Sequence, residues 1–198
     1  MARDEQAPFQ RGETFWGIGV TPADAVSGAQ YEGAEFRHED INYSNVNTVK
    51  PHRTELPVVT RIVRNVGITV TPKQVVKLKA TNHGQIDGQV TVEAQGPCVV
   101  VDEHLPSAGV LQNDLLHVVV EGPALVTNSS AASTITAGDR VVAATAATSG
   151  AVTAGRVKAQ DLSGVTTALA NNIQNAVGVA LSTTTTTQAD VLIYVRRF

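Results

Sequence analysis

The chain has 198 residues, a formal net charge of −3 and a sequence pI of about 5.9, a length that suits one domain with an appendage or two small domains. This weakly acidic balance provides no basic face for nucleic acid, and no apolar run approaches the roughly 20 residues of a membrane-spanning helix. The single cysteine, Cys98, excludes an intrachain disulfide, so stability must come from burial or assembly. The first residues, MARDEQAPFQRGE, lack the apolar core of a signal peptide, and we therefore expect synthesis in a reducing cytoplasm.

Residues 1–57 predict an extended N-terminal arm. Prolines at positions 8, 22, 51 and 57 and five glycines interrupt the segment, and no helical or alternating period is sustained. Nine acidic and five basic residues give it a net charge of −4. Six of the eight aromatic residues lie here, and aromatic side chains offer large contact areas at interfaces. We expect the arm to become ordered on a neighbouring protein through Phe9, Phe15, Trp16, Tyr31, Phe36 and Tyr43; the alternative is a disordered tail.

Residues 58–198 predict a β-rich domain, in which 58–114 form a first β block. The runs VVTRIVR (58–64), VVKLKA (75–80), QVTVEA (89–94), CVVVD (98–102), LLHVVVEG (115–122) and ALV (124–126) are separated by turn-forming residues. VKLKA and QVTVEA alternate polar with apolar residues, which is typical of a strand with one wet face. CVVVD and HVVVE are continuously apolar in their centres, which indicates strands buried on both faces. The short match between VEAQGP (92–97) and VEGP (120–123) is insufficient to establish a repeat.

The C-terminal third is the part of the chain around which we expect the rest of the fold to be arranged. Its β-rich runs are AGDRVVAA (137–144), GRVKAQ (155–160), AVGVALS (176–182) and ADVLIYVRR (189–197), each introduced by or containing turn residues. Apolar residues at 162, 165, 169, 173 and 176 have helical spacing, so we expect one short helix over 162–177. Ser163 would cap its start and Gly178 would end it. The predicted fold is therefore mainly β, a small barrel or sandwich with one short helix after an extended arm.

The chemistry-bearing residues do not form a recognisable catalytic motif. The five histidines, at positions 38, 52, 83, 104 and 117, are scattered and show no HExxH spacing. Asp102, Glu103 and His104 form the best candidate polar site, although a turn after a strand also explains them. Cys98 precedes a valine run and is expected to pack as a small apolar residue. We therefore expect no catalytic residue, no cofactor and no metal site.

Several short segments resemble the capsid cement, or head decoration, proteins of tailed bacteriophages. They are TAGDRVV (136–142), GRVK (155–158), VGVAL (177–181) and DVLIYV (190–195), with VEGPA (120–124) resembling the family's first barrel strand. The resemblance covers about residues 115–198. It implies a cement-like β-barrel over 115–198 in a structural protein of the virion, made in the host cytoplasm and placed on the outer capsid surface. It further implies a homotrimer that binds the major capsid protein and clamps neighbouring capsomers, without nucleic-acid or membrane partners. The helix-like insert, the first β block and the aromatic arm depart from the family's pattern.

Two other classes remain as alternatives. A carbohydrate- or receptor-binding β-module, such as a phage adhesin or tail component, would carry exposed aromatics on a barrel face, yet only Tyr194 and Phe198 follow residue 57. A hydrolase would require a clustered acid, base or metal set. We therefore take the capsid cement function as the leading hypothesis.

Overall fold

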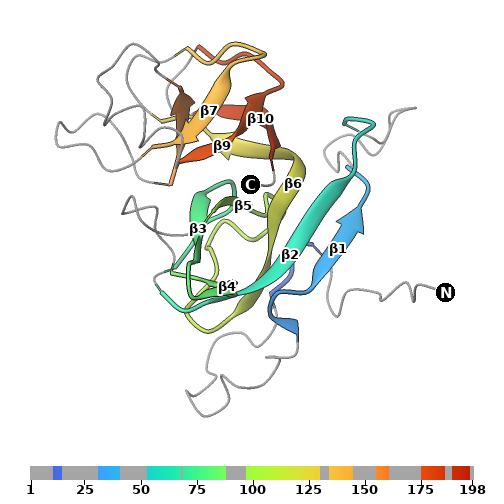
Figure 1. The fold of residues 1–198 in the computed structure, drawn as a ribbon, viewed down its shortest axis with the longest axis vertical. Coiled ribbons are helices and arrows are strands. Elements are labelled where there is room, and N and C mark those ends of the chain that lie inside the picture. Colours follow the sequence, from blue (N-terminus) through green and yellow to red (C-terminus); the bar gives the residue numbers. More distant parts are fainter. Residues whose placement is uncertain are drawn as a thin grey trace.

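The computed structural model describes residues 11–14, 31–40, 53–67, 69–87, 97–129, 134–144, 155–160, 175–185 and 189–196 (Figure 1). Its ten strands are β1 (Glu35–His38), β2 (Val58–Asn65), β3 (Val75–Lys79), β4 (Asn82–Ile86), β5 (Cys98–Val101), β6 (Leu115–Thr127), β7 (Arg140–Ala143), β8 (Val157–Ala159), β9 (Ala176–Ala180) and β10 (Asp190–Val195). Hydrogen bonds connect all ten into one sheet. The prediction of a mainly β fold is confirmed.

Five strands of the first half form a closed ring, which we call the first barrel. Strand β2 pairs with β6, β6 with β5, β5 with β3 and β3 with β4, all antiparallel. The ring closes because β4 pairs in parallel with β2, at Arg64–Gln85 and Asn65–Ile86. One face of each strand points inside. The interior consists of buried aliphatic side chains, which include Val63, Val70, Val76, Leu78, Ile86, Val99, Val101, Leu105, Val110, Leu116, Val118 and Val120.

The second half repeats this arrangement in a second barrel. The C-terminal half of β6 pairs with β10, β10 with β9, β9 with β7 and β7 with β8, again all antiparallel. A parallel bridge between Asn128 and Val157 closes the ring, and the Ser129 N–H donates to the Val157 carbonyl at 2.7 Å. The order and direction of the pairings therefore match those of the first barrel strand for strand. The chain thus contains two copies of one five-stranded topology.

Equivalent turns in the two barrels confirm the repeat at the level of hydrogen bonds. The backbone N–H of Thr71 donates to Gln74 Oε1 at 3.1 Å, and that of Thr136 donates to Asp139 Oδ2 at 2.8 Å. Each turn also contains a residue with positive φ, Lys73 at 63° and Gly138 at 96°. The sequences TVTPKQVV (69–76) and TITAGDRV (134–141) correspond, with a constant offset.

Strand β6 belongs to both barrels. Its N-terminal half pairs with β2 and β5, and its C-terminal half pairs with β10. Gly122, with φ of 105°, lies where the first pairing ends and the second begins. A β-carbon at Gly122 would lie 2.3 Å from the Pro57 carbonyl oxygen, so the close approach of β2 requires glycine here.

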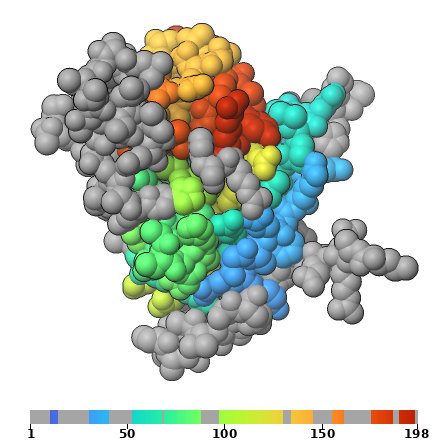
Figure 2. All heavy atoms as spheres, in the orientation of Figure 1, coloured from blue at the N-terminus to red at the C-terminus, as the bar shows by residue number. Residues whose placement is uncertain are grey.

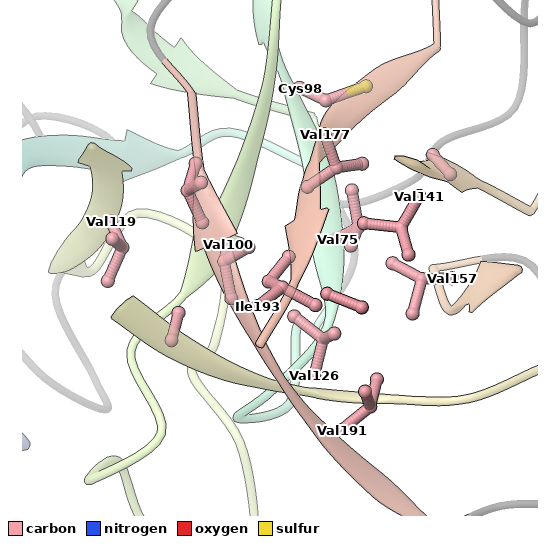
Figure 3. Close-up of a cluster of buried hydrophobic side chains, with 14 of the residues drawn as sticks. Val75, Cys98, Val100, Val119, Val126, Val141, Val157, Val177, Val191 and Ile193 are labelled. Atoms are coloured by element: carbon pink, nitrogen blue, oxygen red, sulfur yellow. The ribbon is translucent and has the colours of Figure 1, made fainter. Parts of the chain in front are cut away.

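The two barrels share a hydrophobic contact. The interior of the second barrel continues onto Val75, Cys98, Val100 and Val119, which lie on the outer face of the first barrel (Figure 3). As a result β5 is buried on both faces over all four of its residues, which confirms the prediction made from its continuous apolar run.

Other expectations differ from the structure or lie outside it. The helix predicted over 162–177 is wrong at its end, because Ala176 and Val177 belong to β9 and pair with β7. The pairing of β9 across the barrel overrides the local helical spacing. Residues 161–174 and the expected strand at 89–94 lie outside the described residues. In the described ranges, no helix has the length and apolar character needed to cross a membrane.

Part of the predicted arm lies on the first barrel. Strand β1 pairs antiparallel with β2, with Phe36 opposite Thr60 and His38 opposite Val58. Figure 2 shows residues 31–40 at the surface beside β2. For these residues the structure shows contact with the same chain, where the sequence led us to expect contact with a neighbouring protein.

Candidate functional site

A buried polar cluster lies where the N-terminal segments meet the first barrel. Short segments at 11–14, 31–40 and 53–57 bring their charged groups against β2, β6 and the turn after β5. We call this the anchor cluster, and it comprises Arg11, His38, Asp40, Arg53, Thr60, Asp102, Glu103, His104 and His117.

Asp102 is the first of two anchoring points. It directly follows β5, and its carboxylate receives Arg11 Nε at 3.1 Å and Arg11 Nη2 at 2.9 Å. The Asp102 side chain is fully buried and that of Arg11 is 8% exposed. The His104 backbone N–H also donates to Asp102 Oδ1, which fixes the turn. A paired, forked hydrogen bond of this kind is the geometry in which a buried charge pair is tolerated.

Arg53 is the second anchoring point and joins two carboxylates. Its guanidinium donates to both oxygens of Asp40, at 2.7 and 3.2 Å, and its Nη1 lies 2.8 Å from Glu103 Oε1. Thr54 donates its hydroxyl to Asp40, and Glu103 accepts the Leu125 N–H at 2.9 Å. Burial alone would lower the pKa of Arg53, but the Asp40 hydrogen bonds and the Glu103 charge raise it. The guanidinium therefore stays charged and links the arm to both β6 and the 102–105 turn.

Two histidines meet at one buried hydroxyl between these anchors. Thr60 Oγ1 lies 2.8 Å from His38 Nε2 and 3.0 Å from His117 Nδ1. A hydroxyl has one proton, so it donates to one imidazole and accepts from the other. Burial, followed by the nearby His117 and Arg11, lowers the pKa of His38 to about 4. The His38 imidazole is thus neutral at pH 7, and this hydrogen-bond chain joins β1, β2 and β6.

The predicted aromatic contact residues divide into two groups. Tyr31 and Phe36 pack on buried Ile62 and Leu115, and the Phe36 ring meets His117 edge-on with centroids 6.2 Å apart. They therefore cover the outer face of β2 and β6. The other four, Phe9, Phe15, Trp16 and Tyr43, lie outside the described residues.

An open groove lies beside the anchor cluster at the end of the β1–β2 pair. Its volume is about 620 Å³. Its walls come from the two segments that Arg53 and Asp40 hold together, and the lining residues are Arg37, His38, Glu39, Asp40, Thr54, Glu55, Leu56 and Pro57. Among these lining residues, Leu56 is a large apolar side chain that is exposed.

The polar groups of this region are buried or engaged in hydrogen bonds with one another. The Asp102 and Asp40 carboxylates accept hydrogen bonds from arginines, and Thr60 is fully buried. Within the described ranges, no group of three or more histidine, cysteine or acidic side chains has a metal-binding arrangement. Cys98 packs in the core between the barrels, and burial raises the pKa of its thiol to about 11. A thiol with that pKa is protonated at neutral pH and is a poor nucleophile.

Sequence reasoning found two acceptors of this cluster, Asp102 and Glu103, but neither Asp40 nor the arginine donors. Asp102, Glu103 and His104 were the best polar candidate, and the structure places all three together in the anchor cluster. Arg11 and Arg53 were not singled out, because a bond across 91 or 50 residues leaves no local pattern. The excess of acids over bases within the arm bears only on the Arg53–Asp40 pair, because Asp102 and Glu103 lie outside the arm.

The chain matches no family model, no curated protein and no solved structure.

Proposed function

We propose that this protein is a structural component of a virus particle, a cement protein that binds the outside of the major capsid shell. In this role the two barrels form a rigid body, and the N-terminal segments contact neighbouring capsomers. The proposal includes assembly as a homotrimer and attachment through Phe9, Phe15, Trp16 and Tyr43, which belong to the same arm as the anchored residues.

One observation carries the proposal. Arg11 and Arg53 fasten the N-terminal segments to the first barrel through buried, forked ion pairs, rather than through exposed contacts. A force that a bound neighbour exerts on the arm would therefore be transmitted to the first barrel through Asp102, Asp40 and Glu103. A protein that clamps neighbouring subunits needs such a mechanical link, whereas a small-molecule enzyme does not.

The barrel interiors support the same function class. The first interior consists of buried valine, leucine and isoleucine side chains, and the second of buried valine, isoleucine and alanine side chains. A sugar- or receptor-binding module would use exposed aromatics, and Tyr194, the aromatic of the described strands β2 to β10, is partly buried. We therefore develop only the cement function.

Quantitative mass spectrometry of purified particles tests the proposal. The copy number of this chain is compared with that of the major shell protein in the same particles. We expect a ratio near one or a simple fraction of it, because a cement protein occupies equivalent sites over the whole shell. A handful of copies per particle would point to the tail, and absence from washed particles would refute the capsid function. A host protein of similar abundance in the lysate serves as the control for contamination.

A further inference from the structure

A polar cavity lies at the junction of the two barrels. Its volume is about 190 Å³, and its lining includes Thr71, Lys73, Gln74, Thr127, Gly155 and Arg156. Pockets for organic ligands typically enclose about 300–1,000 Å³, so this space suits a small ion better than a metabolite. Two of the lining side chains, Lys73 and Arg156, are cationic, and none of the described lining residues is acidic. The ion that fits is therefore an anion.

Both barrels contribute to the walls of this cavity. The turn at 71–74 precedes β3 in the first barrel, and Gly155 and Arg156 precede β8 in the second. The Val75 N–H donates to the Gly155 carbonyl at 2.7 Å, which holds the two walls together. An ion bound between them would contact both barrels at once.

Arg156 carries a charge that no acidic residue in the described part of the chain neutralises. The ion pairs found there do not include Arg156, and its buried Nη1 has no hydrogen-bond partner. The pairs Arg11–Asp102 and Arg53–Asp40 show how this fold otherwise buries a guanidinium, each against a carboxylate. A buried donor without an acceptor costs free energy. An anion in the cavity would supply both the acceptor and the counter-charge.

Lys73 holds its side chain at the cavity despite an unfavourable backbone conformation. Its φ is 63°, a left-handed conformation that is strained for a residue with a β-carbon. The equivalent residue in the second barrel is Gly138, which adopts a φ of 96° without that strain. Strained residues are concentrated at functional sites, which indicates that the turn before β3 needs the lysine side chain.

Gln74 adds neutral donors to the two cations. Its Oε1 accepts the Thr71 N–H at 3.1 Å, which leaves the amide nitrogen for other partners. This nitrogen packs against Gly155, where an added β-carbon would lie only 2.4 Å from it. The lack of a side chain at Gly155 therefore gives the Gln74 amide its place at the cavity.

Asp190 is the acidic group that acts against an anion here. Its carboxylate pairs with Lys73 and accepts the Thr127 hydroxyl at 3.4 Å. The Lys73–Asp190 pair is partly exposed, so water weakens the attraction between its charges. Because Arg156 has no such partner, the site keeps a net positive charge.

We propose that the junction of the barrels binds a small tetrahedral oxyanion of the phosphate or sulfate class through Arg156, Lys73 and Gln74. Guanidinium and ammonium groups are common protein ligands of such ions. A planar carboxylate offers its oxygens in one plane, whereas a tetrahedral ion offers oxygens to donors on several walls. Binding to the folded state alone would stabilise the junction as the ion concentration rises. The site goes beyond the proposed cement function, because it lies within one chain and requires no shell.

Isothermal titration calorimetry of the full chain with sodium phosphate tests the site, with sodium chloride added to keep the ionic strength constant. We expect the parent to bind phosphate saturably in the millimolar range, and sulfate similarly. Arg156→Gln should weaken phosphate binding roughly tenfold or more, because it removes the charge that has no other partner. Asp190→Asn should tighten binding severalfold, since it removes the carboxylate that competes for Lys73.

Lys73→Gly separates ion binding from folding. Glycine adopts the positive φ without strain, so this variant should fold as the parent does but bind phosphate roughly tenfold more weakly. Arg140→Gln removes an exposed charge of β7 and should leave binding unchanged. The proposal would be overturned by a parent without saturable binding, by equal binding in Arg156→Gln, or by acetate binding as tightly as phosphate. None of these results bears on the copy number in particles, so the two proposals fail separately.

Discussion

Asp102 shows at the scale of one residue how the N-terminal segment is held. Its carboxylate is fully buried and receives both nitrogens of the Arg11 fork. Burying a charge is costly, and removing its partner leaves that cost uncompensated. Lys73 and Asp190 also form an ion pair, but it lies at the surface, with side chains 31% and 35% exposed.

We expect Asp102→Asn to lower the free energy of unfolding by about 3 kcal/mol, because it leaves the buried Arg11 guanidinium without its counter-charge. The matched change Asp190→Asn should cost less than about 1 kcal/mol, since water screens the exposed pair. Urea unfolding of both variants measures the difference. Equal costs would contradict the anchoring role of Arg11 and Asp102.

His38 makes the stability depend on pH. Its pKa in the folded protein is about 4, against 6.5 in the unfolded chain, so between these values the unfolded chain binds more protons. Stability from this residue is therefore present above about pH 6.5 and is lost as the pH falls toward 4. Burial is the largest cause of the lowered pKa of His38; His117 and Arg11 lower it further, and Asp102 opposes them.

Replacing His38 by Gln should weaken the decrease in melting temperature between about pH 7 and about pH 5, because the amide does not titrate but can still bond to Thr60. Asp114 acts in the opposite direction, since burial raises its pKa to about 6 and protonation favours the folded state. That contribution is the same in parent and variant and cancels in their difference. Identical pH profiles for the two proteins would show that His38 does not titrate as described.

At the scale of one element, β6 determines how the two barrels are joined. The sequence predicts two runs, 115–122 and 124–126, separated at the glycine–proline pair. The structure has one strand of 13 residues, Leu115–Thr127, that continues through Gly122. Gly122 has a positive φ and lies close to the Pro57 carbonyl. The strand therefore continues through the predicted break and only changes its partner strand there.

Gly122→Ala should destabilise the protein by more than about 2 kcal/mol, because the new methyl group meets a backbone carbonyl and the residue has positive φ. Gly138 is the matched control, because its φ is 96° and a β-carbon there would have no heavy atom within 4 Å. Gly138→Ala should therefore cost only about 1 kcal/mol, the backbone strain alone. Thermal unfolding of both variants distinguishes the two contributions, and similar losses would argue against the steric contact with β2.

At the scale of the whole molecule, the repeat explains why equivalent positions differ in burial. Val100 pairs with Val119 in the first barrel, and Val179 pairs with Tyr194 at the same place in the second. Val100 is fully buried because the second barrel covers it, whereas Val179 is only partly buried. The same strand position is thus core in one copy and surface in the other.

The two faces of β5 should therefore be equally important for stability. Val99 points into the first barrel and Val100 into the contact between the barrels. We expect Val99→Ala and Val100→Ala each to lower the free energy of unfolding by about 2 kcal/mol, from the lost burial and the cavity that remains. Val179→Ala should cost less than about 1 kcal/mol. Chemical denaturation measures all three, and a small effect at Val100 would mean that the barrels do not support each other.

The sequence by itself predicted most of the strands, but not β1 or β4, and it predicted a wet face for β3, where Lys77 is buried. Continuous valine runs identified β5 and the core of β6, and the turn residues at 137–139 placed the start of β7, because these preferences act within a few residues. It also identified Asp102, Glu103 and His104 as a polar group. The tertiary structure alone decided their partners, the strand at Ala176–Ala180 in place of a helix end, and the closing of two rings. The physical reason is that these features depend on contacts between residues far apart in the chain, whose energies leave no trace in local composition or period.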